Sequence, residues 1–226
     1  MLPSQSLPDP NVKRMALRAI CRHFGEEIGY AELTMETTIR QFLGHVRLGA
    51  RVFNVYDQFS DINALEPEFG KFVLVAEAQD VCFWGVDLDA LDRIDAAVYR
   101  GGYLVDADDE AGYERLEDMP EVPFTWEEFG GSFFQFFASS LFWNAVNDGW
   151  EFSGMAKLKR GEISRLQAAT TAVDIGSNKC GLDFLSHGTD AIIAVDVSRE
   201  VFAAARTSAD WEMLLGVVPR LHIWDD

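Results

Sequence analysis

The chain has 226 residues, of which 48% are hydrophobic and 25% are charged, a balance that suits one large globular domain with a substantial core. Its formal net charge is −18, from 37 acidic residues against 19 Lys and Arg. Such a surface repels phosphate backbones, so nucleic acid and anionic membranes are not expected partners. The charge suits either solubility or the attraction of a basic protein, and composition does not decide between these roles.

The cysteines and the apolar runs indicate a cellular compartment. Cys21, Cys82 and Cys180 are widely spaced and odd in number, which favours free thiols in a reducing cytosol over a disulfide framework. No basic stretch leads into an apolar signal-peptide core, and no uninterrupted apolar run approaches 18 residues. We therefore expect a cytoplasmic protein.

After a loose polar lead over residues 1–8, the first predicted element is an amphipathic helix. Asp9 can cap it, Pro10 suits its first position, and Gly25 can end it. Lys13 falls away from the apolar positions and is expected on a solvated face.

Two shorter elements are predicted next. Residues 34–43 suggest a short helix capped by Thr34, and residues 51–56 suggest an edge strand.

Two apolar runs around a short polar break, residues 72–76 and 81–86, predict a β-hairpin. Both runs are rich in Val, Phe and Trp and are too short for a helix. Neither run alternates between apolar and polar residues, a pattern typical of strands that are covered on both faces. The hairpin is therefore expected at the centre of a sheet, with helices packed against it.

A further strand is predicted over residues 97–105, with an interruption at Gly101-Gly102, and a strongly acidic segment follows it. Residues 106–128 contain ten acids against Arg115 alone, a net charge of 1 − 10 = −9, which is half of the charge of the chain. The acidic charge is therefore concentrated in about a tenth of the sequence.

The most hydrophobic element is a helix predicted over residues 133–147, for which Ser132 and Gln135 form a capping-box pattern. It is apolar almost all round, so it should be buried against the hairpin. A short helical turn capped by Thr125 is expected just before it.

The C-terminal part of the chain predicts strands over residues 170–175, 182–185 and 191–197, at least two of them antiparallel. A final helical region capped by Ser198 is expected through residue 215, with Thr207-Ser208 as a candidate break, and the tail over residues 217–226 suggests a short strand.

The sequence lacks the motifs of common enzymes, including the nucleophile elbow, the P-loop and the dinucleotide fingerprint. The acids between residues 106 and 117 are spaced like a calcium loop, but Ala111 stands where that loop needs Gly. We predict no catalytic residue, metal site or cofactor. The four histidines have no metal-ligand spacing and are expected to be surface or packing residues: His23, His45, His187 and His222.

The hairpin and its neighbours resemble the core signature of the SUKH superfamily. In that pattern a strand ends in an acid, a Gln follows, and the next strand carries an aromatic-Gly pair. The matching positions are Glu77, Gln79 and Trp84-Gly85, then Ala97-Val98-Tyr99 on the following strand, and the helix start Ser132 to Phe137 with Leu141. The similarity extends over residues 15–215.

The resemblance implies an α+β fold in which helices cover a single mixed, largely antiparallel sheet, with residues 1–226 as one domain. Most members of the superfamily are bacterial immunity proteins that neutralise polymorphic toxins, often nucleases, and others are regulatory interaction domains. The expected function is therefore non-enzymatic toxin neutralisation. A regulatory or scaffolding domain and an unrecognised enzyme are the alternatives.

Nuclease toxins are basic because they hold phosphates, so an acidic inhibitor gains association rate by electrostatic steering. The acidic segment is therefore the predicted partner-binding surface, with two aromatic anchors. A cognate protein toxin is the expected partner, and the oligomeric state stays open. The predicted contact residues are Asp106, Asp108, Asp109, Glu110, Tyr113, Glu114, Glu117, Asp118, Glu121 and Trp126.

Overall fold

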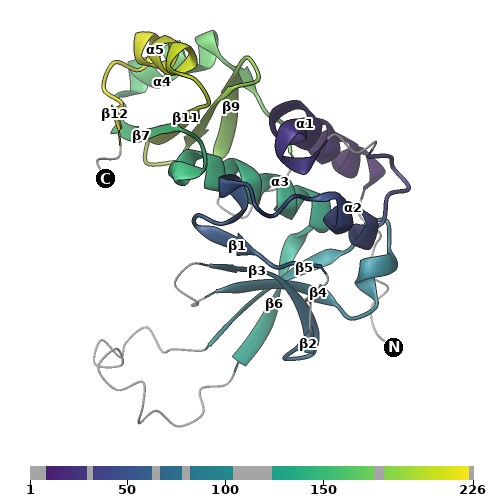
Figure 1. The fold of residues 1–226 in the computed structure, drawn as a ribbon. Coiled ribbons are helices and arrows are strands. Elements are labelled where there is room, and N and C mark those ends of the chain that lie inside the picture. Colours follow the sequence, from purple (N-terminus) through teal and green to yellow (C-terminus); the bar gives the residue numbers. More distant parts are fainter. Residues whose placement is uncertain are drawn as a thin grey trace.

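A computed structural model describes residues 9–29, 33–62, 67–77, 82–103, 124–175 and 181–223. The described chain forms five α-helices and two antiparallel sheets, which confirms the α+β class. The prediction of a single sheet is wrong, because the last third of the chain builds a second one. Figure 1 shows helix α3 (Phe133–Asn144) lying between the two sheets. The other helices are α1 (Pro10–Ile28), α2 (Ile39–His45), α4 (Arg160–Ala169) and α5 (Ser208–Val217).

Helix α1 begins as predicted and continues further than predicted. The Asp9 side chain accepts a hydrogen bond from the amide of Asn11 at 2.9 Å, and Pro10 occupies the first turn. The helix passes through Gly25, which is buried, and ends at Gly29 with a left-handed φ of 77°. Gly25 does not end the helix, because it lies on the face that packs into the core.

Lys13 is buried at 2% exposure, so the prediction of a solvated lysine is wrong. Its ammonium group donates to the backbone carbonyls of Met35 and Thr37, each at 2.8 Å, and of Ile94 at 2.5 Å. The loops before α2 and before the strand at Ala97 fold over this side of α1, and their carbonyl oxygens need a donor there. Burial lowers the pKa of Lys13.

Helix α2 starts later than predicted. Its cap is Thr38, which forms a capping box with Gln41. Thr34 instead lies in a turn, where its amide donates to the Thr37 hydroxyl at 2.9 Å. Residues Arg51–Phe53 form a 3₁₀ turn, and the edge strand follows at Asp57–Phe59, so the predicted strand over residues 51–56 is wrong.

The N-terminal sheet has the order β1-β3-β4-β5-β6, with β2 paired to β3. The predicted hairpin is confirmed as β3 and β4, which pair antiparallel and lie inside the sheet. The strands are β1 (Asp57–Phe59), β2 (Pro67–Glu68), β3 (Lys71–Glu77), β4 (Phe83–Asp87), β5 (Ala97–Tyr103) and β6 (Phe124–Ser132).

Among the described residues, helices cover one face of the hairpin, the face toward α3 (Figure 1), whereas the prediction was that both faces are covered. The register shifts between Val73, opposite Gly85, and Val75, opposite Trp84, so Leu74 is the extra residue of a β-bulge. The bulge lets the adjacent residues Leu74 and Val75 both be buried. The unbroken apolar run reflects this irregularity and not two covered faces.

Strands β5 and β6 differ from the prediction in two ways. Residue Thr125 caps no helix, because Phe124–Ser132 is a nine-residue strand paired with β5. The two glycines do not interrupt β5. A Cβ on Gly101 would lie 2.6 Å from ring atoms of both Phe124 and Trp126, so glycine makes room for these rings.

Helix α3 confirms the predicted buried helix and its cap. The Ser132 amide donates to the side chain of Gln135 at 3.0 Å, completing the capping box. Its phenylalanines pack on both sides, and a wider helical turn, Ala145–Gly149, ends it.

The C-terminal sheet has the order β12-β7-β11-β10-β9-β8 and is covered on both faces. Ile192 faces the core that contains α3, whereas Ile193 packs in a second core with Trp211 and Leu214 of α5 and Leu166 of α4. The strands are β7 (Phe152–Lys157), β8 (Thr171–Ala172), β9 (Asp183–His187), β10 (Ala191–Val195), β11 (Glu200–Ala205) and β12 (His222–Ile223).

Strand β11 overturns the prediction of a helix from Ser198. Residues Glu200–Ala205 pair with both β10 and β7, and α5 begins only at Ser208, after its cap Thr207. Strand β7 and helix α4 had no counterpart among the predicted elements. Within the described residues, no helix has the length and apolar character that a membrane span needs.

Candidate functional site

The structure describes one of the ten predicted contact residues, Trp126 on β6. The other nine lie outside the described residues, as does Ala111 of the calcium-like pattern. Those nine are Asp106, Asp108, Asp109, Glu110, Tyr113, Glu114, Glu117, Asp118 and Glu121.

Trp126 belongs to a group of aromatic side chains on the side of the N-terminal sheet that faces away from α3. Its indole Nε1 donates to the carbonyl of Phe69 at 3.0 Å. The Phe124 ring stacks on Phe69, with centroids 4.1 Å apart and planes 9° apart, and lies 5.8 Å from Phe83. We call this group the outer aromatic face, and its members are Phe69, Phe83, Tyr99, Phe124 and Trp126.

Phe69 has an unusual backbone conformation. It lies with Gly70 in the tight turn between β2 and β3, at φ angles of 47° and 82°. A left-handed φ is ordinary for Gly and costly for a bulky residue. The stacked ring of Phe124 and the hydrogen bond from Trp126 hold it there, and the side chain is still 56% exposed. The turn therefore presents an aromatic ring to solvent.

Charged side chains border this face. The Lys71 ammonium lies 3.4 Å from the centre of the Tyr99 ring and forms a 2.7 Å ion pair with Asp87. Glu128, the last acid of the acidic segment, is exposed on β6 opposite Tyr99. An apolar centre with a charged rim is the usual composition of a protein-binding surface.

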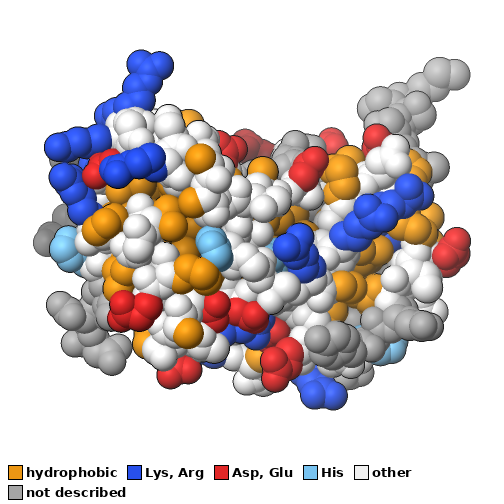
Figure 2. Space-filling model, turned by 90° about the horizontal axis from the view of Figure 1, so that it is seen from above, with side chains coloured by type: hydrophobic (Ala, Val, Ile, Leu, Met, Phe, Trp, Pro, Cys, Tyr) orange, Lys and Arg blue, Asp and Glu red, His pale blue; other side chains and the backbone are white. Residues whose placement is uncertain are grey.

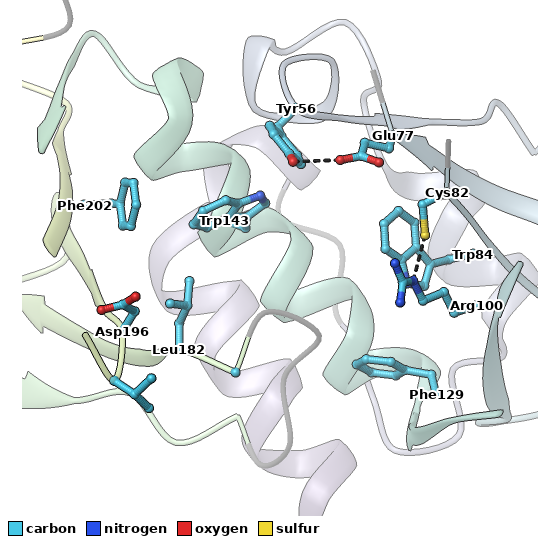
Figure 3. A pocket seen from close by; sticks show the side chains of 12 residues that line it. Tyr56, Glu77, Cys82, Trp84, Arg100, Phe129, Trp143, Leu182, Asp196 and Phe202 are labelled. Carbon is cyan, nitrogen blue, oxygen red and sulfur yellow. Dashed lines mark hydrogen bonds between the residues drawn. The ribbon is translucent and has the colours of Figure 1, made fainter. Parts of the chain in front are cut away.

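A second candidate site is a pocket of about 630 Å³ between the two sheets, with α3 behind it (Figure 3). We call it the inter-sheet pocket. Its walls come from the N-terminal sheet, from α3, and from the turn between β10 and β11. The lining residues are Tyr56, Glu77, Cys82, Trp84, Arg100, Phe129, Trp143, Gly181, Leu182, Asp196, Val197 and Phe202.

Two hydrogen bonds organise the wall made by the N-terminal sheet (Figure 3). The Tyr56 hydroxyl donates to Glu77 Oε1 at 2.7 Å, and the Arg100 Nε donates to Cys82 Sγ at 2.9 Å. The contact with Cys82 raises the pKa of Arg100, and the carboxylates of Glu127 and Glu77 add to that shift. Arg100 therefore stays cationic in this wall of the pocket.

On the opposite wall, Asp196 lies at the start of the turn between β10 and β11. Its Oδ1 accepts the amide of Glu200 at 2.9 Å, and the turn closes through Arg199 at a left-handed φ of 71°. Desolvation opposes ionisation of Asp196, but hydrogen bonds from Ser198 and from the Glu200 amide hold its pKa below the ordinary value. Asp196 is therefore ionised at neutral pH.

The inter-sheet pocket has no counterpart among the predictions from the sequence, in which Glu77 and Trp84 are residues of the hairpin. The lining residues come from distant segments, and no spacing in the sequence links Tyr56 to Phe202. The turn before β11 lacks the Gly that usually marks a left-handed position, so no local signal identified the strand that carries Phe202.

Histidines and cysteines offer no alternative centre in the part of the chain that the structure describes. No group of three His, Cys, Asp or Glu side chains there is arranged to hold a metal ion. His23 is buried, bonded through Nδ1 to the carbonyl of Thr189 at 3.0 Å, and burial lowers its pKa, as expected of a packing histidine. Cys21 is exposed and Cys82 is buried.

Comparison with known proteins gave no match, whether to family models, to curated proteins or to solved structures. The resemblance to the SUKH superfamily therefore rests on the residues quoted for it.

Proposed function

We propose that this protein is a non-enzymatic immunity protein of the bacterial cytoplasm that binds and neutralises a basic toxin. The contact surface is formed by the acidic segment together with the outer aromatic face. The observation that carries the proposal is the position of Trp126, which lies in that face and belongs to the acidic segment.

The sheet anchors both ends of the acidic segment beside the outer aromatic face. Tyr103, the last residue of β5, pairs with Phe124, the first residue of β6. The chain between them has eight acids against Arg115, a net charge of 1 − 8 = −7. An acidic segment of this kind attracts a basic partner over a distance, and rigid aromatic anchors supply the short-range affinity.

The charge is unevenly distributed over the molecule. Figure 2, seen from above in the view of Figure 1, shows two groups of Lys and Arg side chains on that face. Arg14, Arg18 and Arg22 lie exposed at intervals of about one turn along α1, which is on this side. The exposed arginines of α1 therefore disfavour contact between this helix and a basic partner.

The positions that resemble the SUKH pattern fall on matching elements. Glu77 ends β3, Trp84-Gly85 lies on β4, Ala97-Val98-Tyr99 opens β5, and Ser132 caps α3. Gln79 lies outside the described residues. This correspondence supports the proposal of a SUKH-like domain.

The first test is rescue of cells that express the toxin domain encoded beside this chain. The purified proteins should then form a stoichiometric complex whose affinity falls with salt. Reversal of four charges, Asp108→Lys, Asp109→Lys, Glu110→Lys and Glu114→Lys, should weaken binding and flatten the salt dependence. Trp126→Ala should weaken binding by roughly 30-fold, as expected for a hot-spot residue worth about 2 kcal/mol.

A matched control variant separates a local surface from total charge. The control replaces four exposed acids elsewhere with Lys, so the net charge of the protein changes by the same amount. The four replacements are Glu26→Lys, Glu151→Lys, Asp183→Lys and Glu212→Lys. An equal loss of affinity in both variants, or none in either, refutes the assignment of the acidic segment. Capture of several unrelated partners without rescue indicates the regulatory or scaffolding alternative.

A further inference from the structure

The inter-sheet pocket has the size and composition of a binding site for a small charged group. Its volume of about 630 Å³ falls within the range of roughly 300–1,000 Å³ that ligand sites occupy. Its lining combines five aromatic rings with a few charged side chains. It opens on the side of the N-terminal sheet that carries α3, away from the outer aromatic face.

Three of these rings meet at steep angles. Trp143 lies 5.6 Å from Tyr56 with the ring planes 80° apart, and 5.4 Å from Phe202 with the planes 71° apart. Figure 3 shows Trp143 between the other two rings, above the wall made by α3. Aromatic rings that border a site from several directions stabilise organic cations through their negative faces.

The charges around the pocket favour a cation. Glu77 and Asp196 are its acidic lining residues, on opposite walls (Figure 3). Arg100 is the cationic lining residue, and its Nε donates to Cys82 Sγ at 2.9 Å in the wall made by the N-terminal sheet. The charged lining residues therefore have a net charge of 1 − 2 = −1.

We infer that the inter-sheet pocket binds an organic cation of the alkylammonium class, such as a free amine or the side chain of a lysine. The charged head lies between the carboxylates of Glu77 and Asp196, and the apolar stem packs against Trp143, Phe202 and Leu182. This inference goes beyond toxin neutralisation and does not depend on it.

The test is a titration of the whole chain with three small probes of equal length, followed by NMR of the backbone amides and tryptophan indoles. Butylammonium should bind with a dissociation constant in the millimolar range and shift the Trp143 indole signal. The neutral isostere 1-butanol and the anion butyrate should bind more weakly by about tenfold or more, because they lose the ion pair and the cation–π contact.

Conservative variants of the two acids locate the site. Glu77→Gln keeps the acceptor for the Tyr56 hydroxyl, and Asp196→Asn keeps the acceptor for the Glu200 amide. Each should weaken butylammonium binding by about three- to tenfold, whereas the control Glu212→Gln on the exposed face of α5 should have no effect.

Nα-acetyl-lysine methylamide distinguishes the two sources of the cation. Binding at least as tight as that of butylammonium identifies a lysine side chain as the ligand, and weaker binding identifies a free amine. The inference is overturned if 1-butanol binds as well as butylammonium, or if both acid variants retain full affinity. Failure of toxin binding leaves these results unaffected, so the two proposals can fail separately.

Discussion

The buried lysine of α1 gives the most quantitative prediction of the structure. Replacement Lys13→Met keeps the length of the side chain and removes the charge. It leaves the carbonyl oxygens of Met35, Thr37 and Ile94 without their donor, and Asp95 without a neighbouring cation. Removing one member of a buried charged network typically costs about 3–5 kcal/mol.

We therefore expect Lys13→Met to lower the free energy of unfolding by about 3–5 kcal/mol. For a chain of this length, that loss corresponds to a Tm lower by roughly 6–20 °C. Equilibrium unfolding in urea measures it, provided that the m value is unchanged. The control is Arg14→Met at the neighbouring exposed position, which should stay within about 0.5 kcal/mol of wild type.

The reasoning is refuted if Lys13→Met is as stable as Arg14→Met. A second variant keeps the test informative if the first does not fold. In Lys13→Met/Asp95→Asn the buried acid is neutralised together with the lysine, so part of the lost stability should return. The double-mutant cycle should then show a coupling of about 0.5 kcal/mol or more.

Two further predictions concern Asp95, just before β5, and Gly101, within β5. Burial raises the pKa of the Asp95 carboxyl in the folded protein above the ordinary value that it has in the unfolded chain. The contribution of Asp95 to the stability of the fold is therefore complete at a pH below the ordinary pKa and is lost as the pH rises through the raised pKa. The stability difference between Asp95→Asn and wild type should therefore shift in favour of Asp95→Asn as the pH rises above the ordinary pKa of an Asp carboxyl, and a difference that is flat with pH in urea titrations contradicts this. Gly101→Ala should cost about 1–3 kcal/mol and change tryptophan fluorescence, because its Cβ displaces Trp126 and Phe124. The control Gly161→Ala, with nothing within 4 Å of its Cβ, should be neutral or stabilising, and equal effects of the two replacements would contradict the role of Gly101.

Local signals in the sequence predicted the elements that depend on local contacts. The cap at Asp9, the hairpin of β3 and β4, and the capping box that starts α3 were all recognised from neighbouring residues. The burial of Lys13 was missed because its acceptors are 22 to 81 residues away along the chain. The periodicity of hydrophobic residues along the sequence gives no information about contacts between such distant positions.

The second sheet was missed for a related reason. Strand β11 is Glu200–Ala205, whose three alanines have a weak preference for strands, and it forms only because β10 and β7 flank it. Similarly, β6 contains a good helix-start pattern at Thr125, and pairing with β5 overrides it. The inter-sheet pocket is lined by Phe202 of β11 and Phe129 of β6. It could therefore not be predicted while these two strands were missed.

The position of α3 between the sheets has a consequence for the cooperativity of unfolding. Its phenylalanines are buried by strands from both ends of the chain, and Phe142 contacts Phe24 of α1 as well as Phe184 of β9. A chain cut after Gly149 would expose one side of this helix to water. The two sheets are therefore expected to melt in a single transition, and neither half should persist alone after proteolysis between them.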